Sequence, residues 1–277
     1  MKYDKIKLDV PYEKAGLPAE GCEAVLTEII PDPLPNDSRH IPKKTVIICP
    51  GGGYDYCSVR EAEPVALRFV SYGVTAFVLN YSCVNKLFPT NLLELAAAVK
   101  YVRDNAERYN IDKNGIFTCG FSAGGHLAAS LGVHWKKPFA YEPFGIKAEH
   151  ICPDGQILCY PVITVGEKRH DGSIRNITGG SIDNDLAKLV SLENNVTSDV
   201  PPTFIWSTFD DELVPVENTI MFTSALAEHK VPFTSHIFSH GVHGLAMCDD
   251  STANYDGHIN AECAQWFDLA LAWVKRS

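Results

Sequence analysis

The segment 119–126, C-G-F-S-A-G-G-H, constrains the fold more than any other part of the sequence. An apolar run at 115–119 leads into the pattern G-x-S-x-G around Ser122, and an alanine-rich stretch at 126–131 follows. This order predicts a strand, a sharp turn and a helix, in which glycines let neighbouring chain pass while the serine is held in strained geometry. Ser122 is therefore a candidate nucleophile at a helix N-terminus, where backbone N–H groups favour developing negative charge. The motif alone also fits an ordinary serine N-cap.

Strand-like and helix-like stretches alternate on both sides of this motif. Apolar, strand-like runs are found at 45–49, 74–79, 115–119, 156–160, 203–208 and 233–238. Helical spacing of apolar residues is found between them at 61–72, 92–102 and 216–229, and again near the C-terminus around Trp266. The alternation predicts an α/β fold with a mostly parallel sheet, helices on both faces and functional loops at the carboxyl ends of the strands.

Two further segments have their own predictions. The apolar run 24–30 is followed by the proline-rich stretch 31–35, so we expect an edge strand that leaves through an irregular loop. Residues 165–200 are polar and lie between two strands, and we interpret them as a small cap or substrate loop. With no linker or repeat among the 277 residues, we expect 1–277 to form a single domain.

Charge and composition exclude several classes of function. The formal net charge of −10 argues against nucleic acid and anionic membranes as partners and favours a small or neutral substrate. The charged N-terminus lacks the apolar core of a signal peptide, and no stretch reaches membrane-spanning length, so we expect a cytoplasmic protein. The nine cysteines form no C-x-x-C pair, which favours reduced thiols.

A second glycine-rich site follows the strand at 45–49. It reads P-G-G-G-Y from Pro50 to Tyr54. Three glycines can be only a flexible loop, but they also let backbone N–H groups turn toward a bound oxygen atom. An HGGG-type loop of this kind supplies one half of the oxyanion hole beside a nucleophile elbow, and here Pro50 stands in place of the histidine.

An acid and a histidine follow two later strands. Asp210 and Asp211 come after the strand at 203–208, and His240 and His243 after the strand at 233–238. Nucleophile, acid and histidine, each after its own strand, is the chain order of α/β-hydrolases. The alternative for the two histidines is a metal site completed by an aspartate at 249 or 250.

Four stretches together resemble a known family: CPGGGY, GIFTCGFSAGGHLAASLG, PPTFIWSTFDDELVPVEN and SHGVHGL. They look like small bacterial serine esterases of the α/β-hydrolase superfamily, near the acetyl xylan esterase and BD-FAE-like group, and the likeness runs from about Thr45 to the C-terminus. The resemblance implies Ser122 as nucleophile and Asp211, four residues before Pro215, as the orienting acid. It also implies that His243, which precedes a glycine, is the base, and that Asp210 is a solvated or turn-forming neighbour.

The resemblance further implies an α/β-hydrolase fold, no cofactor and no metal. The oxyanion donors would be the N–H groups of Gly52, Gly53 and Ala123. From strand-end positions we expect Tyr54, Pro161 and Trp206 to line the substrate cleft.

The expected activity is hydrolysis of short-acyl esters, in particular deacetylation of small carbohydrate or related esters. The assembly that we consider for the chain is a homodimer. The alternatives are a prolyl oligopeptidase-like serine peptidase, a lipase-like esterase of longer acyl chains and a non-catalytic binding protein. Charged residues dominate 165–200, so we expect no apolar channel for a long acyl chain there. A non-catalytic member would have lost the serine or the histidine, and both are present.

Overall fold

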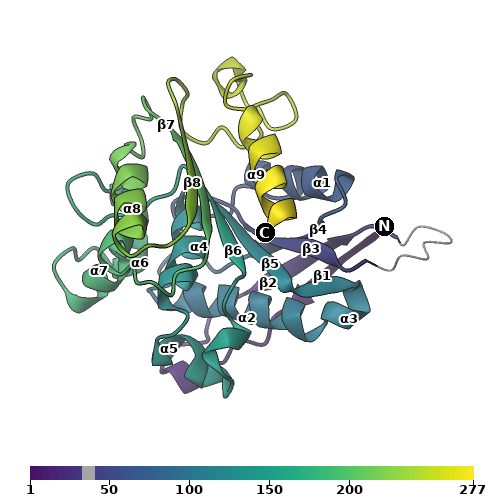
Figure 1. Ribbon diagram of the computed structural model, residues 1–277. Coiled ribbons are helices and arrows are strands. Elements are labelled where there is room, and N and C mark those ends of the chain that lie inside the picture. Colours follow the sequence, from purple (N-terminus) through teal and green to yellow (C-terminus); the bar gives the residue numbers. More distant parts are fainter. Residues whose placement is uncertain (33–40) are drawn as a thin grey trace.

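A computed structural model describes residues 1–32 and 41–277, and its centre is a sheet whose strands run through the whole molecule (Figure 1). In the described residues the sheet has eight strands in the order β1-β2-β4-β3-β5-β6-β7-β8. From β4 to β8 every neighbouring pair is parallel, whereas β1–β2 and β2–β4 are antiparallel. The strands are β1 Lys2–Lys7, β2 Val25–Ile30, β3 Lys43–Cys49, β4 Thr75–Asn80, β5 Ile111–Phe121, β6 Gly155–Cys159, β7 Thr203–Thr208 and β8 Phe233–Phe238.

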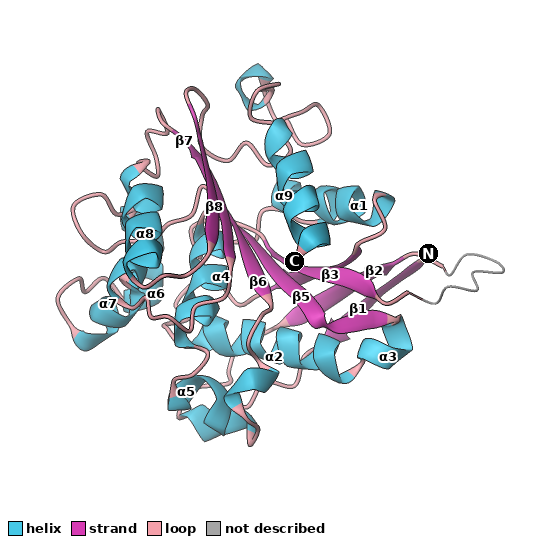
Figure 2. Cartoon of the chain, viewed as in Figure 1, coloured by secondary structure: helices cyan, strands magenta, loops and turns pink. Residues whose placement is uncertain are grey.

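Helices cover both faces of this sheet, as Figure 2 shows. Helices α1 and α9 pack on one face, while α2, α4 and α8 pack on the other. The sequence prediction of a mostly parallel α/β sheet is therefore confirmed. The helices are α1 Glu63–Ser71, α2 Thr90–Asp104, α3 Ala106–Tyr109, α4 Ala123–His134, α5 Pro138–Tyr141, α6 Asp171–Thr178, α7 Asp185–Val190, α8 Glu217–Glu228 and α9 Gln265–Arg276.

Strand β3 shows why the central strands are apolar on both sides. Val46 and Ile48 pack into the core beneath α1 and α9, whereas Ile47 and Cys49 pack into the core beneath α2 and α4. All four side chains are fully buried. Successive residues of a strand point to opposite faces, so a strand covered on both faces needs a continuous apolar run.

The prediction that 24–30 forms an edge strand is wrong. Strand β2 lies between β1 and β4, and β1 forms the edge instead. The sequence of β1, K-Y-D-K-I-K, is too polar to be recognised as a strand, because an edge strand with one solvated face buries few side chains. Of the proline-rich stretch that follows, Pro31 and Asp32 have no regular structure and 33–35 lie outside the described residues.

The segment 165–200 is more regular than its sequence indicated, since it contains α6 and α7. Several of its apolar side chains, among them Ile174, Ile177 and Val190, are buried in the core shared with α2 and α4. The charged side chains of this segment face outward, as at Glu167 and Lys168. The segment therefore packs as amphipathic helices over the carboxyl ends of the strands.

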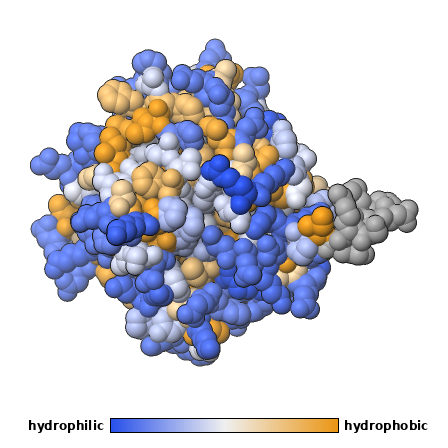
Figure 3. Space-filling model, in the orientation of Figure 1, coloured by the Kyte–Doolittle hydropathy of each residue, from blue (hydrophilic) through white to orange (hydrophobic). Residues whose placement is uncertain are grey.

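The surface in the orientation of Figure 1 is mostly hydrophilic, with apolar patches near β8 and α9 (Figure 3). Phe233, Ile237 and Leu269 are apolar residues exposed on these two elements. Among the described residues, no helix combines the length and the apolar composition needed to cross a bilayer. The single domain, the homodimer and the cytoplasmic location stay predictions.

Candidate active site

Ser122 lies in a sharp turn between β5 and α4, with φ 54° and ψ −117°. A positive φ is uncommon for a residue with a side chain and marks a strained position. The turn requires close packing of the chain, because a Cβ added at Gly124 would lie 2.0 Å from the carbonyl oxygen of Cys49. This strained turn holds the serine at the carboxyl end of the central strand.

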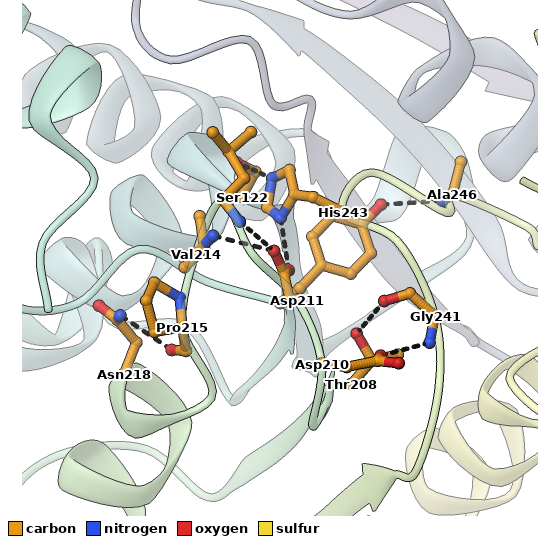
Figure 4. Close-up of polar contacts among 12 residues, drawn as sticks. Ser122, Thr208, Asp210, Asp211, Val214, Pro215, Asn218, Gly241, His243 and Ala246 are labelled. Atoms are coloured by element: carbon orange, nitrogen blue, oxygen red, sulfur yellow. Dashed lines mark hydrogen bonds and ion pairs between the residues drawn. The ribbon is translucent and has the colours of Figure 1, made fainter. Parts of the chain in front are cut away.

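Ser122, His243 and Asp211 form a continuous hydrogen-bonded chain (Figure 4). The Nε2 atom of His243 is 2.8 Å from Ser122 Oγ, and its Nδ1 atom is 2.7 Å from Asp211 Oδ2. The other carboxylate oxygen accepts hydrogen bonds from the N–H groups of Leu213 and Val214, both at 2.9 Å. An ionised carboxylate only accepts, so Nδ1 carries the proton and Nε2 is left as the acceptor for the serine hydroxyl.

Asp210 and His240 form a separate and exposed pair. Asp210 accepts a hydrogen bond from His240 Nδ1 at 3.0 Å. It also accepts the N–H of Gly241 at 2.7 Å (Figure 4), so it supports the turn that precedes His243. The hydrogen bond from His240 holds the pKa of Asp210 below its usual range. The described residues contain no group of three or more His, Cys, Asp or Glu side chains close enough to hold a metal, which leaves the metal alternative for His240 and His243 without support.

The glycine loop lies against the same serine. Gly52 has φ 122°, and a Cβ there would lie 2.1 Å from the carbonyl oxygen of Tyr56, so only glycine fits the turn. Ala123 is the first residue of α4. The N–H groups of Gly52, Gly53 and Ala123 find no hydrogen-bond acceptor within the described part of the chain. These are the free donors that an oxyanion site needs.

A cavity of about 570 Å³ opens around these groups. Ser122, His243, Gly52 and Gly53 all line it. A larger cavity of about 890 Å³ lies elsewhere, between α1 and the β1–β2 edge, and none of these four residues lines it. The smaller cavity is lined further by Asp55, Tyr56, Ser58, Arg60, Glu61, His170, Gly172, Arg175, Asn176, Leu213 and Gly244.

The prediction that Tyr54, Pro161 and Trp206 line the cleft is corrected, because all three side chains are buried away from this cavity. Trp206 is fully buried and stacks on Trp266 at 5.5 Å. Pro161 packs against the elbow helix, where a Cβ added at Gly125 would lie 2.8 Å from it. Trp206 lies within β7, where successive side chains point to opposite faces, and its side chain points into the core. Tyr54 and Pro161 lie in the loops that follow β3 and β6.

Tyr54 has a structural contact in place of the predicted one. Its hydroxyl donates to Nδ1 of His126 at 2.8 Å, while Nε2 of the same ring donates to the carbonyl of Val190 at 2.9 Å. Burial lowers the pKa of His126 to about 4, so the ring stays neutral and can accept. Tyr54 thus fixes the glycine loop to α4 and to the cap segment.

Glu61 and His170 line the cavity and were not identified from the sequence. Glu61 is buried and accepts hydrogen bonds from the N–H of Gly51 at 2.9 Å and from the hydroxyl of Tyr160 at 2.7 Å. The Tyr160 hydroxyl in turn accepts the N–H of Ala246 at 2.9 Å. Glu61 therefore ties the glycine loop to the loop that carries His243. Charged residues surround it in the sequence, and nothing local marks which of them is buried.

Replacing Glu61 with glutamine is expected to lower the free energy of unfolding by about 1–3 kcal/mol, because a buried hydrogen-bond partner is lost. Glutamine offers one side-chain oxygen for two donors, Gly51 N–H and the Tyr160 hydroxyl. The measurement is chemical denaturation together with hydrolysis of an aryl acetate, whose rate should also fall. Glu63→Gln, at an exposed position two residues on, is the matched control and should stay within about 0.5 kcal/mol of the parent. Equal stability of the two variants would contradict a linking role for Glu61.

Comparison with known proteins settles the family. The sequence model of the BD-FAE family matches residues 34–226, well over half of the chain. The chain belongs to the BD-FAE family. This match confirms the resemblance that the motifs indicated. The fold and the family of this chain are those of carboxylic-ester hydrolases with the α/β-hydrolase fold.

Two curated relatives resemble this BD-FAE chain over about three quarters of its length. Endo-1,4-beta-xylanase B of Butyrivibrio fibrisolvens is 39% identical over 223 residues, which are 78% of this chain and 34% of that protein. The acetylxylan esterase of Xylanibacter ruminicola is 31% identical over 210 residues, 74% of this chain and 41% of that protein. The chain thus spans about a third to two fifths of the length of these two relatives.

Solved structures resemble the chain over nearly all of its length. The acetyl ester-xyloside bifunctional hydrolase of Caldicellulosiruptor lactoaceticus has a TM-score of 0.79 and 38% identity, covering 92% of this chain and 88% of its own. A carboxylesterase of Lactobacillus plantarum has a TM-score of 0.85 and 29% identity, and the match covers 100% of this chain and 98% of that protein's chain.

Proposed function

We propose that this protein is a serine esterase in which Ser122 is the nucleophile, His243 the general base and Asp211 the residue that orients His243. The observation that carries the proposal is the hydrogen-bonded chain of these three side chains, with Ser122 and His243 at the wall of one cavity. The side chain of Asp211 is fully buried and that of His243 is 13% exposed, so the hydrogen bond between them is shielded from water. Membership of the BD-FAE family supports the reaction class.

The reaction proceeds through an acyl-enzyme. Nε2 of His243 takes the proton of Ser122 as Oγ attacks the carbonyl carbon of the ester. The tetrahedral intermediate collapses, and the alcohol leaves with that proton from His243. A water molecule then gives a proton to His243 and attacks the acyl group, which releases the acid and restores the serine hydroxyl. No cofactor takes part in these steps.

The negative oxygen of the intermediate would be bound by the N–H groups of Gly52, Gly53 and Ala123. Support comes from their lack of other acceptors in the described chain and from the position of Ala123 at the start of α4. Loss of one such donor typically costs about 3–4 kcal/mol of transition-state stabilisation. Because the donors belong to the backbone, the strained glycine loop, rather than any side chain, determines this part of the site.

For the substrate we propose short-acyl esters, in particular acetyl esters of small carbohydrates. The names of the acetylxylan esterase and of the acetyl ester-xyloside hydrolase support this choice. The cavity supports it independently, because polar side chains such as those of Asp55, Arg60 and Asn176 outnumber apolar ones among its lining residues. Most apolar residues of the cap segment are buried in the core, and among the described residues none of their side chains lines this cavity.

The value of kcat/KM is expected to fall steadily from acetate to octanoate esters of one alcohol. Each methylene that finds an apolar pocket would add about 0.8 kcal/mol of binding, so an available channel would make specificity rise with chain length. The measurement is a series of 4-nitrophenyl esters with a single enzyme preparation. A maximum at six carbons or beyond would replace the deacetylase proposal with a lipase-like one.

A further inference from the structure

His170 lines the same cavity as Ser122 and His243 but belongs to the cap segment, immediately before α6. Its ring lies against the glycine loop, since a Cβ added at Gly53 would be 3.7 Å from the ring atom Cε1. The imidazole is therefore placed between the cap and the oxyanion donors. The mechanism above uses none of its atoms.

The hydrogen bonds of His170 determine where its proton lies. Nδ1 accepts the backbone N–H of Ser173 at 3.2 Å, as the N-cap of α6, and is 2.8 Å from Ser173 Oγ. A backbone N–H can only donate, so Nδ1 holds a lone pair and the neutral ring carries its proton on Nε2. Among the described residues, Nε2 has no hydrogen-bond partner. The cavity wall thus includes an unused N–H donor.

This donor persists at neutral pH. Burial, and next the nearby charge of His243, lower the pKa of His170, whereas Asp171 and Asp211 act in the opposite direction with smaller effect. With Nδ1 used by the helix cap and Nε2 protonated, His170 is a donor and offers no second base beside His243.

We propose that His170 is a positioning residue whose Nε2–H donates a hydrogen bond to a hydroxyl on the alcohol part of the ester, next to the scissile bond. The assignment follows by elimination within an acetyl ester: the methyl group accepts no hydrogen bond, and the carbonyl oxygen is taken by the N–H groups of Gly52, Gly53 and Ala123. The acceptors that remain belong to the alcohol. The inference rests on the proposed esterase function and names its substrate class, esters of polyols such as monoacetylated sugars.

A site that hydrogen-bonds a substrate hydroxyl discriminates against an analogue that lacks one, because its buried polar group is left unpaired. A monoacetylated methyl xyloside has hydroxyls beside the ester, and 4-nitrophenyl acetate has none. The selectivity ratio is kcat/KM for the xyloside divided by kcat/KM for the aryl acetate. The change in this ratio when His170 is replaced therefore measures the hydrogen bond that His170 makes to the substrate hydroxyl.

The test variant is His170→Ser, because serine is a preferred N-cap and keeps an acceptor for the Ser173 N–H while the ring donor is removed. The selectivity ratio is expected to fall about tenfold, the size of one lost hydrogen bond, mainly through a higher KM for the xyloside. Hydrolysis of the aryl acetate should fall by a smaller factor than hydrolysis of the xyloside. His170→Asn, which also keeps a cap acceptor but shortens the side chain, should behave in the same way.

Asn184→Ala is the matched control. Asn184 caps α7 in the same segment by accepting the N–H of Ala187 at 2.8 Å, and it does not line the cavity. Losing this cap loosens the segment without touching the cavity, so the selectivity ratio should stay at the parent value. Because both rates come from one preparation, partial unfolding of a variant cancels in the ratio.

An unchanged selectivity ratio in both His170 variants, or an equal fall in Asn184→Ala, would overturn the role of His170. Such a result would leave the esterase proposal intact, provided that the parent protein hydrolyses aryl acetate through Ser122. Absence of any ester hydrolysis by the parent would instead refute the proposed function itself.

Discussion

Replacing Ser122 with alanine is expected to lower kcat for aryl acetate hydrolysis by about 10⁶-fold, because the nucleophile and its proton transfer to His243 are both lost. The fold should be nearly unaffected. Alanine keeps the Cβ atom that the turn already accommodates, and the one side-chain hydrogen bond removed joins Ser122 to His243. Stability should therefore stay within about 1 kcal/mol of the parent.

The measurements for Ser122→Ala are steady-state hydrolysis, circular dichroism and the thermal transition. Labelling of the parent with a fluorophosphonate, followed by mapping of the modified peptide, identifies the nucleophile directly. A label on another residue, or an alanine variant that retains most of its rate, would show that Ser122 is not the nucleophile.

Replacing Asp211 with asparagine is expected to reduce kcat by about 10⁴-fold, the loss that follows when the base is held in the wrong tautomer. Asp211 accepts the Nδ1 proton of His243, whereas an amide NH₂ at this position would donate toward Nδ1 and move the ring proton to Nε2. With Nε2 protonated, the ring cannot accept the proton of Ser122.

Asp210→Asn is the control for this prediction, since it changes the neighbouring carboxylate with the same chemistry. Asp210 is exposed and, within the described residues, its side chain bonds only to His240 and the Gly241 N–H, so its loss should lower kcat by less than about tenfold. The measurement is aryl acetate hydrolysis across the pH range. The two variants are compared at equal concentrations of folded protein. Comparable losses in the two variants, or the larger one at Asp210, would contradict the assignment of Asp211.

Local signals in the sequence were enough to predict the elements that carry the site. The buried parallel strands are continuous apolar runs, and the turns that follow them are identified by glycines, an Asp pair and a His-x-x-His pattern. Side chains after parallel strands meet at one edge of the sheet, so the chain order alone brought Ser122, Asp211 and His243 to a common place. The structure then joins them by hydrogen bonds of 2.7 and 2.8 Å.

Burial of individual side chains was decided only by the tertiary structure. Trp206 was expected in the cleft and lies in the core, while Glu61 lies buried beneath the glycine loop although its neighbours in the sequence are solvated. Both outcomes depend on elements far away in the chain, such as Trp266 for the first and Tyr160 for the second.

The sequence by itself determined the fold class, the family and the three residues proposed for the chemistry, because those depend on patterns within short stretches. The residues that line the cavity were decided by tertiary structure, because they depend on where the cap segment packs in the fold. His170 is a polar residue of a polar loop in the sequence. Only the packing of α6 over the strand ends places the His170 ring against Gly53. The N-cap residue of this helix thereby lines the candidate active site.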